Sequence, residues 1–173
     1  MKRRGLAIGL AAVALCAPIA AAGAAGDGST VATCERAIIG HGSADWRDES
    51  VVAGPVGVHR PPLNQMSRSP KGLVTKMGLL IEGREPETVT VSVPPSLRGR
   101  VFLYYGEPTT FANDPGFAEV EFQLCGNKPR TVWPGGIRVK GEAPVRLNVF
   151  TEERPQPFVL RLGKPRIYQP PTS

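Results

Sequence analysis

The chain has 173 residues and a formal net charge of +6 with neutral histidines, and it contains 20 glycines and 18 prolines. This length suits one domain with a buried core and is too short to predict two. Lys2, Arg3 and Arg4 supply half of the excess charge, so their removal lowers the net charge from +6 to +3. We therefore expect no nucleic-acid partner, since the remaining basic residues are few and scattered.

Residues 1–24 have the pattern of an export signal. Three cations are followed by a stretch without charge, 5–26, whose most apolar part is 6–15. Ala22-Gly23-Ala24 then provides a small-residue cleavage site. We predict a signal peptide over 1–24 and a secreted or extracytoplasmic location at the cell envelope. The alternative is an uncleaved N-terminal anchor, which would be the only membrane contact.

Two cysteines remain after export, because Cys16 lies in the signal peptide. A pair of thiols in an oxidising compartment predicts a disulfide between Cys34 and Cys125. Closing so long a loop is expected to stabilise the fold by about 2–4 kcal/mol. A redox or metal-binding pair is not supported, since the two cysteines lie in separate segments without CxxC spacing.

The loop "GHGSADWRDE" contains residue types that could support catalysis or metal binding. His41 with Asp45 or Asp48 makes a small secreted hydrolase or a metal-dependent enzyme an alternative function. The spacing lacks the alternating aspartates of a calcium loop and the elbow that presents a hydrolase serine. We therefore predict no catalytic residue, no metal and no cofactor, and interpret the segment as a polar loop.

Alternation of apolar and polar residues predicts β-strands along the rest of the chain. The clearest segments, each with one apolar and one polar face, are 88–93, 119–124, 145–149 and 158–162. Less regular segments that we also predict as strands are 34–39, 51–58, 73–82, 100–105 and 137–140. Gly78 is expected to mark a bulge or a break. Helices are not expected, because prolines interrupt almost every interval.

About nine short strands separated by turns predict an all-β fold, a two-sheet antiparallel β-sandwich. An immunoglobulin-like Greek key is the favoured topology, and a jelly roll or a small barrel is the alternative. We predict one β-sandwich domain over 25–165 and an extended, proline-rich C-terminal tail over 166–173.

Trp133 stands directly before Pro134-Gly135-Gly136, a sequence typical of a strand, a type II turn and a second strand. The indole is expected to lie in the core or to anchor a hairpin, and a sugar-stacking platform is the alternative. Tyr104 and Tyr105 are adjacent in a predicted strand, so one of them is expected to point outward and to contact a ligand.

Long loops are where sandwich domains usually carry function, and two stand out at 59–71 and 106–116. The first is basic and rich in proline. Together with exposed aromatic residues it predicts a ligand-binding surface made of Tyr104, Tyr105, Phe111, Trp46, Arg60 and Arg68.

The run "FQLCGNKPRTVWPGGIRVKGEAPVRLNV", residues 122–149, resembles the C-terminal part of uncharacterised exported β-rich proteins of high-GC Gram-positive bacteria. The shared features are a cysteine after a strand, an aromatic-Pro-Gly-Gly turn and two short strands. Glu142-Ala143-Pro144 stands where some of these proteins have a second cysteine, which leaves Cys34 as the partner of Cys125. The resemblance implies location and fold and no activity.

The function predicted from the sequence is a non-enzymatic, secreted or envelope-associated β-sandwich module for binding or scaffolding at the cell envelope. Its partner would be an unidentified envelope component or protein. A purely structural domain of an envelope assembly is a further alternative.

Overall fold

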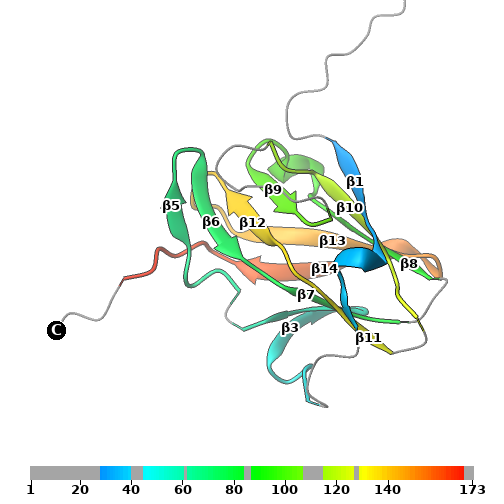
Figure 1. The fold of residues 1–173 in the computed structure, drawn as a ribbon. Helices are drawn as coiled ribbons and strands as arrows, with labels where there is room; N and C mark the ends of the chain where they lie inside the picture. The colour runs from blue at the N-terminus through cyan, green and yellow to red at the C-terminus, as the bar shows by residue number, and fades with distance from the viewer. Residues whose placement is uncertain are drawn as a thin grey trace, which may run out of the picture.

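The computed structural model in Figure 1 describes residues 28–39, 45–60, 62–83, 87–106, 115–126 and 129–169. The predicted signal peptide lies outside these residues, as do His41 and Phe111. In the described part the chain forms strands and two single 3-10 turns, η1 (Cys34–Arg36) and η2 (Pro95–Leu97), with no α-helix. None of these residues forms a helix that is long and apolar enough to cross a bilayer. The prediction of an all-β fold is confirmed.

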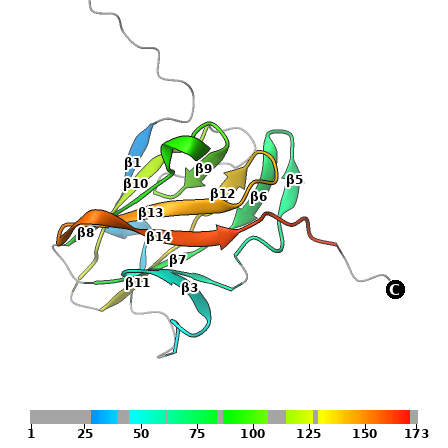
Figure 2. The ribbon, with the colours of Figure 1, turned by 180° about the vertical axis from the view of Figure 1, so that it is seen from behind.

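The described strands form three sheets, so the prediction of two sheets is wrong in number. The first sheet contains the most regular strands. Figure 2 shows it from behind, and its order is β1 (Ser29–Ala32), β10 (Glu119–Gln123), β8 (Thr88–Ser92), β13 (Val145–Thr151), β14 (Arg154–Gly163). Neighbours are antiparallel except that β1 runs parallel to β10. β14 begins well before its predicted start despite two prolines, because it is an edge strand, where a missing N–H costs no ladder bond.

The other two sheets are antiparallel throughout. The order of the second is β2 (Ile38–Ile39), β11 (Arg130–Trp133), β7 (Leu79–Glu82), β4 (Val56–His59), β3 (Ser50–Ala53). The order of the third is β5 (Ser67–Ser69), β6 (Gly72–Lys76), β12 (Gly136–Val139), β9 (Val101–Tyr104). Over the described residues no sheet closes on itself, so the small-barrel alternative is wrong.

One bent ribbon joins the second sheet to the third. β6 pairs with β12 and β7 with β11, so that 72–82 runs antiparallel to 130–139 through both sheets. The ladder is interrupted at the bend, where the N–H of Met77 donates to the carbonyl of Gly135 at 2.9 Å. The predicted break at Gly78 is confirmed. The predicted hairpin after Trp133 is wrong, because β11 and β12 pair with the two halves of the opposite strand instead of with each other.

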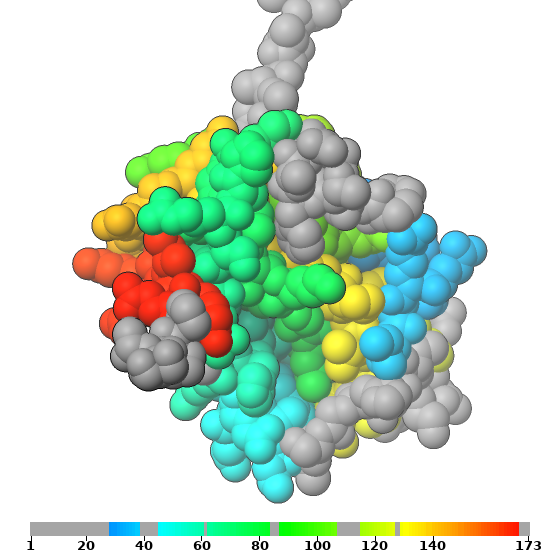
Figure 3. Space-filling view, turned by 60° about the vertical axis from the view of Figure 1, so that its left-hand side comes forward, coloured from blue at the N-terminus to red at the C-terminus, as the bar shows by residue number. Residues whose placement is uncertain are grey.

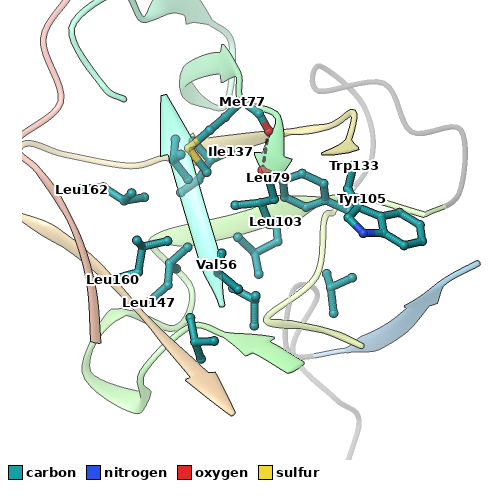
Figure 4. Packing of buried hydrophobic residues seen from close by; sticks show 14 of the residues in the cluster. Val56, Met77, Leu79, Leu103, Tyr105, Trp133, Ile137, Leu147, Leu160 and Leu162 are labelled. Atoms are coloured by element: carbon teal, nitrogen blue, oxygen red, sulfur yellow. Dashed lines mark hydrogen bonds between the residues drawn. The ribbon is translucent and has the colours of Figure 1, made fainter. Parts of the chain in front are cut away.

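All three sheets contribute to one hydrophobic cluster, part of which is drawn in Figure 4. The predicted inward residues Val120, Phe122 and Leu124 are buried, and so is Trp133. The indole meets the ring of Phe122 edge to face at a centroid distance of 5.3 Å. Its prediction as a core residue is confirmed, and the same burial rules out an exposed sugar platform.

The disulfide between Cys34 and Cys125 is confirmed, with the two Cα atoms 5.5 Å apart. Cys34 lies in the connection from β1 to β2, and Cys125 lies in the connection from β10 to β11. Both connections pass from the first sheet to the second. The bond therefore clamps two crossings between sheets at one point.

The start of the predicted C-terminal tail is held against an earlier segment. The N–H of Arg166 donates to the carbonyl of Leu63 at 2.8 Å, and the N–H of Tyr168 donates to that of Met66 at 3.1 Å. Figure 3 shows these C-terminal residues in red against the green part of the chain. The boundaries predicted for the domain and tail stay a prediction.

Candidate functional site

A cleft of about 400 Å³ opens where three connections meet at one end of the first and second sheets. We call it the end cleft. Its walls come from the β3–β4 turn, the segment that leads into β8 and the β13–β14 turn. The described residues that line it are Arg47, Gly54, Pro55, Glu82, Glu87, Thr88, Val89, Thr151, Glu152, Glu153 and Phe158.

Two polar contacts connect the walls of the end cleft. The guanidinium of Arg47 forms an ion pair with Glu82, and both side chains are partly exposed, at 49% and 40%. The hydroxyl of Thr88 donates to Oε1 of Glu152 at 3.1 Å. A pair as exposed as Arg47–Glu82 contributes at most about 1 kcal/mol to stability, so its main effect is to position the groups.

The ring of Phe158 forms the apolar wall of the end cleft. Gly54 has φ +58°, and a Cβ there would lie 2.5 Å from the ring, so the glycine backbone packs directly against it. The guanidinium carbon of Arg154 lies 4.4 Å from the ring centroid. Glycine is thus required at 54 both for its backbone conformation and for this close approach.

The charge of the end cleft is opposite to that of the whole chain. Four carboxylates and one guanidinium line it, whereas the chain as a whole has a net charge of +6. Carboxylate oxygens accept hydrogen bonds and attract cations, and an aromatic ring packs against apolar groups. The end cleft therefore suits a ligand that carries ammonium groups or hydroxyls.

A second cavity, of about 300 Å³, has the opposite character. His59, Arg60 and Lys76 line it, together with the neutral side chains of Gln65 and Thr75. We call it the basic groove. β4 and β7 pair in antiparallel fashion, with Val56 opposite Ile81, so Gly54 and Glu82 lie at one end of the pair and His59 and Gly78 at the other. The end cleft and the basic groove thus lie at opposite ends of the same two strands.

The structure separates the two arginines predicted to contact a ligand. Arg60 lines the basic groove. Arg68 lies on β5 and lines a different cavity, together with Glu142. The short strand that carries Arg68 replaces part of the predicted basic loop, and this strand displaces the two side chains to separate surfaces.

The prediction that Tyr104 or Tyr105 is exposed is wrong. Tyr104 is 2% exposed and Tyr105 is 1% exposed. The hydroxyl of Tyr105 donates to the carbonyl of Met77 at 2.6 Å, and burial raises the pKa of this phenol. Tyr105 is therefore part of the core.

Tyr104 is buried because the chain folds back over it after β9. Leu103 and Phe117 exchange backbone hydrogen bonds of 2.8 and 2.9 Å. A Cβ on Gly116 would lie 2.8 Å from Cζ of Tyr104. The guanidinium of Arg138 lies 5.3 Å from the same ring and donates to the carbonyl of Pro115 at 2.9 Å. Alternation in a strand places Tyr104 on the outer face, but this return of the chain covers that face.

Trp46 is also unavailable as an exposed platform, since it is 5% exposed. A Cβ on Gly57 would lie 2.1 Å from the indole, so the ring rests on the backbone of β4. The neighbouring Arg47 lies 4.7 Å from the ring centroid. Phe111, the remaining predicted aromatic contact, lies outside the described residues.

Asp45 and Asp48 are exposed on the turn before β3, where the N–H of Asp48 donates to the carbonyl of Asp45 at 2.9 Å. His41 lies outside the described residues, so its predicted role with these aspartates is not tested. Within the described ranges no three His, Cys, Asp or Glu side chains gather closely enough to hold a metal ion.

Inspection of the sequence alone missed the end cleft. A signal was present, since Glu82 ends a predicted strand and Glu152-Glu153 separates two predicted strands. The sheet order was needed to bring these turns together, and periodicity does not give that order.

No protein-family model matches the chain, and neither a curated protein nor a solved structure is significantly similar to it.

Proposed function

We propose that the chain is an exported, non-enzymatic β-sandwich module that binds a component of the cell envelope in the end cleft. The export pattern of residues 1–24 and the disulfide between Cys34 and Cys125 support the location. The charge and shape of the end cleft support binding. The end cleft is the single feature on which the proposed binding function rests.

The favoured topology within this proposal is an immunoglobulin-like Greek key. In the first sheet β8 lies between β10 and β13, neither of which is next to it in sequence. The chain therefore leaves this sheet and returns to it between neighbouring strands, as in Greek-key sandwiches. Loops that cluster at one end of such a sandwich commonly form its binding site.

The ligand that best fits the end cleft is a polymer with ammonium groups and hydroxyls. Glu153 adds an acceptor to a wall that Arg47 and Thr88 already position. Phe158, whose ring is packed by Gly54 and Arg154, adds apolar surface to this wall. An anionic polymer would be repelled by the four carboxylates.

Binding is favoured over catalysis because two of the four carboxylates in the end cleft are engaged by other side chains of the protein. Glu82 is engaged with Arg47, and Glu152 accepts a hydrogen bond from Thr88. Both contacts hold an acidic side chain within the protein, where it shapes the cleft. The end cleft is therefore an acidic surface that is formed before a ligand binds.

Retention on insoluble polymers tests this function. The secreted protein is mixed with peptidoglycan, with chitosan, which carries free ammonium groups, and with chitin, in which most of these groups are acetylated. We expect saturable retention on peptidoglycan and on chitosan, with weaker retention on chitin. Absence of saturable retention on every polymer would refute the proposed function.

A variant that replaces two acidic side chains by neutral ones tests whether the end cleft is the binding site. Glu152→Gln/Glu153→Gln keeps the shape of the turn and an acceptor for Thr88, and it removes two negative charges. We expect affinity to fall about fivefold or more. The matched control is Glu35→Gln/Glu142→Gln, which removes two exposed carboxylates outside the end cleft. Equal weakening in both variants would show that overall charge, and not the cleft, determines retention.

A further inference from the structure

We propose that the basic groove is a second, independent binding site, which takes the phosphate group of an anionic envelope component. His59, Arg60 and Lys76 line the groove, and all three are exposed. Guanidinium and ammonium groups donate charge-assisted hydrogen bonds to phosphate oxygens, about twice as strong as neutral ones. No carboxylate is among the described residues that line the groove, so no acidic side chain of the lining repels an anion there.

The remaining lining residues complete a site for a small anionic group. The amide of Gln65 supplies neutral N–H donors that can approach oxygens not reached by the cations, whereas the hydroxyl of Thr75 donates to the carbonyl of Lys76 at 3.2 Å. Val58 and Met77 are buried and form an apolar floor. The volume of about 300 Å³ is at the lower end of small-ligand pockets, which suits one phosphate with its attached group.

Hydrogen bonds fix the backbone beneath the two cationic side chains, Arg60 and Lys76. Lys76 ends β6, and the next residue, Met77, donates to Gly135 at 2.9 Å and accepts from Tyr105 at 2.6 Å. Arg60 follows β4, and its N–H donates to the carbonyl of Glu49 at 2.9 Å. Because the supporting backbone is held in place, less conformational entropy is lost when the side chains converge on a ligand.

The end cleft and the basic groove can act at the same time. Val56 and His59, at the two ends of β4, are three residues apart, a backbone span of roughly 10 Å. Screening at physiological salt acts over about 8 Å, so the carboxylates of the end cleft repel an anion in the basic groove only weakly. A molecule with both sites would connect a cationic envelope polymer to a phosphate-bearing one.

Calorimetric titration of the secreted protein with inorganic pyrophosphate tests the site. We expect saturable binding that weakens about tenfold or more in Arg60→Gln/Lys76→Gln, which removes two charge-assisted donors. The matched control is Arg98→Gln/Lys164→Gln, an identical change of composition and charge at two exposed positions outside the groove. Arg60→Lys/Lys76→Arg keeps both charges and leaves one guanidinium and one ammonium group in the groove, so it is expected to retain affinity within about threefold.

A second arm distinguishes the source of the phosphate. Phosphatidylcholine vesicles with and without phosphatidylglycerol are sedimented with the same variants. Binding that requires phosphatidylglycerol and is lost in the groove variant supports the site and identifies a lipid headgroup. Pyrophosphate binding without vesicle binding supports the site and identifies a phosphate of a soluble or wall polymer.

Two results would overturn the proposal. One is no saturable binding of either probe. The other is equal weakening in the groove variant and its control, since this would reflect only overall charge. Glu152→Gln/Glu153→Gln is expected to leave pyrophosphate affinity unchanged, so failure of the end cleft and failure of the basic groove can be told apart.

Discussion

Tyr105 is hydrogen-bonded to Met77 at the bend of the ribbon that 72–82 forms with 130–139. Its hydroxyl donates to the Met77 carbonyl at 2.6 Å, a contact drawn as a dashed line in Figure 4. The N–H of the same Met77 donates to the carbonyl of Gly135 at 2.9 Å. Met77 is thus held by both of its backbone polar groups at the point where the ladder between β6–β7 and β11–β12 is interrupted. A residue predicted to contact a ligand instead fixes the junction of two sheets.

Removal of this hydroxyl should destabilise the protein. Tyr105→Phe keeps the ring contacts but leaves the buried Met77 carbonyl without its side-chain donor. We expect the free energy of unfolding to fall by about 1–2 kcal/mol, measured by urea denaturation with an unchanged slope. Tyr168→Phe is the matched control, since Tyr168 is 52% exposed. Equal stabilities of Tyr105→Phe and the wild type would contradict this role for the hydrogen bond.

The same phenol makes stability sensitive to alkaline pH. Burial raises the pKa of Tyr105 above its usual value in the folded protein. The unfolded chain releases this proton near pH 10, and the folded chain retains it. The contribution is therefore complete below about pH 10 and decreases at higher pH, by up to about 1.4 kcal/mol per pH unit.

The difference between wild type and Tyr105→Phe isolates this effect, because lysines titrate in the same range in both proteins. We expect the stability advantage of the wild type to shrink as the pH rises from 9 to 11. A constant difference over this range would show that Tyr105 ionises equally in the folded and unfolded states.

Gly135 is required at the bend because the Tyr105 ring lies against its backbone. A Cβ at 135 would lie 2.2 Å from the ring and 2.5 Å from the carbonyl oxygen of Tyr104. The backbone contact cannot be relieved by rotation of a side chain. Gly135→Ala should therefore lower the free energy of unfolding by about 2–4 kcal/mol, measured by thermal or urea denaturation.

Gly78 provides the matched control on the opposite strand of the bend. A Cβ there would meet its nearest neighbour at 3.7 Å, an ordinary contact. We expect Gly78→Ala to change stability by less than about 1 kcal/mol. Similar losses at the two glycines would mean that the bend requires backbone freedom in general, and not the close approach of Tyr105.

Local patterning predicted the strands that have one buried and one exposed face. Val120 and Phe122 point into the core while Glu119 and Glu121 alternate with them, and β13 follows the same rule. The buried face of such a strand can be predicted from its own sequence, because burial of one face requires apolar groups at every second position. The all-β class could be predicted for this reason. The break at Gly78 was predicted from a glycine within a strand, and the burial of Trp133 from its place before a Pro-Gly-Gly turn.

Other features depend on contacts between distant segments. The predicted strand 34–39 is a 3-10 turn at Cys34–Arg36 followed by two strand residues, since the chain there crosses from the first sheet to the second. Likewise 51–58 is two strands around the turn at Gly54-Pro55. β1 and β5 were not predicted, because their sequences, STVA and SRS, contain too few apolar residues to show a period. The end cleft combines three turns and cannot be found without the sheet order.

The disulfide between Cys34 and Cys125 should contribute most of its stability by restricting the unfolded chain, because it closes a loop across a sequence separation of 91. It also clamps two connections that pass from the first sheet to the second. Cys34→Ser/Cys125→Ser should lower the free energy of unfolding by about 2–4 kcal/mol, measured by urea denaturation. The matched condition is the wild type in reductant, which should unfold at a similar urea concentration. Two reactive thiols in the native protein would contradict the bond, and an unchanged stability of the double variant would contradict its role in holding the sheets together.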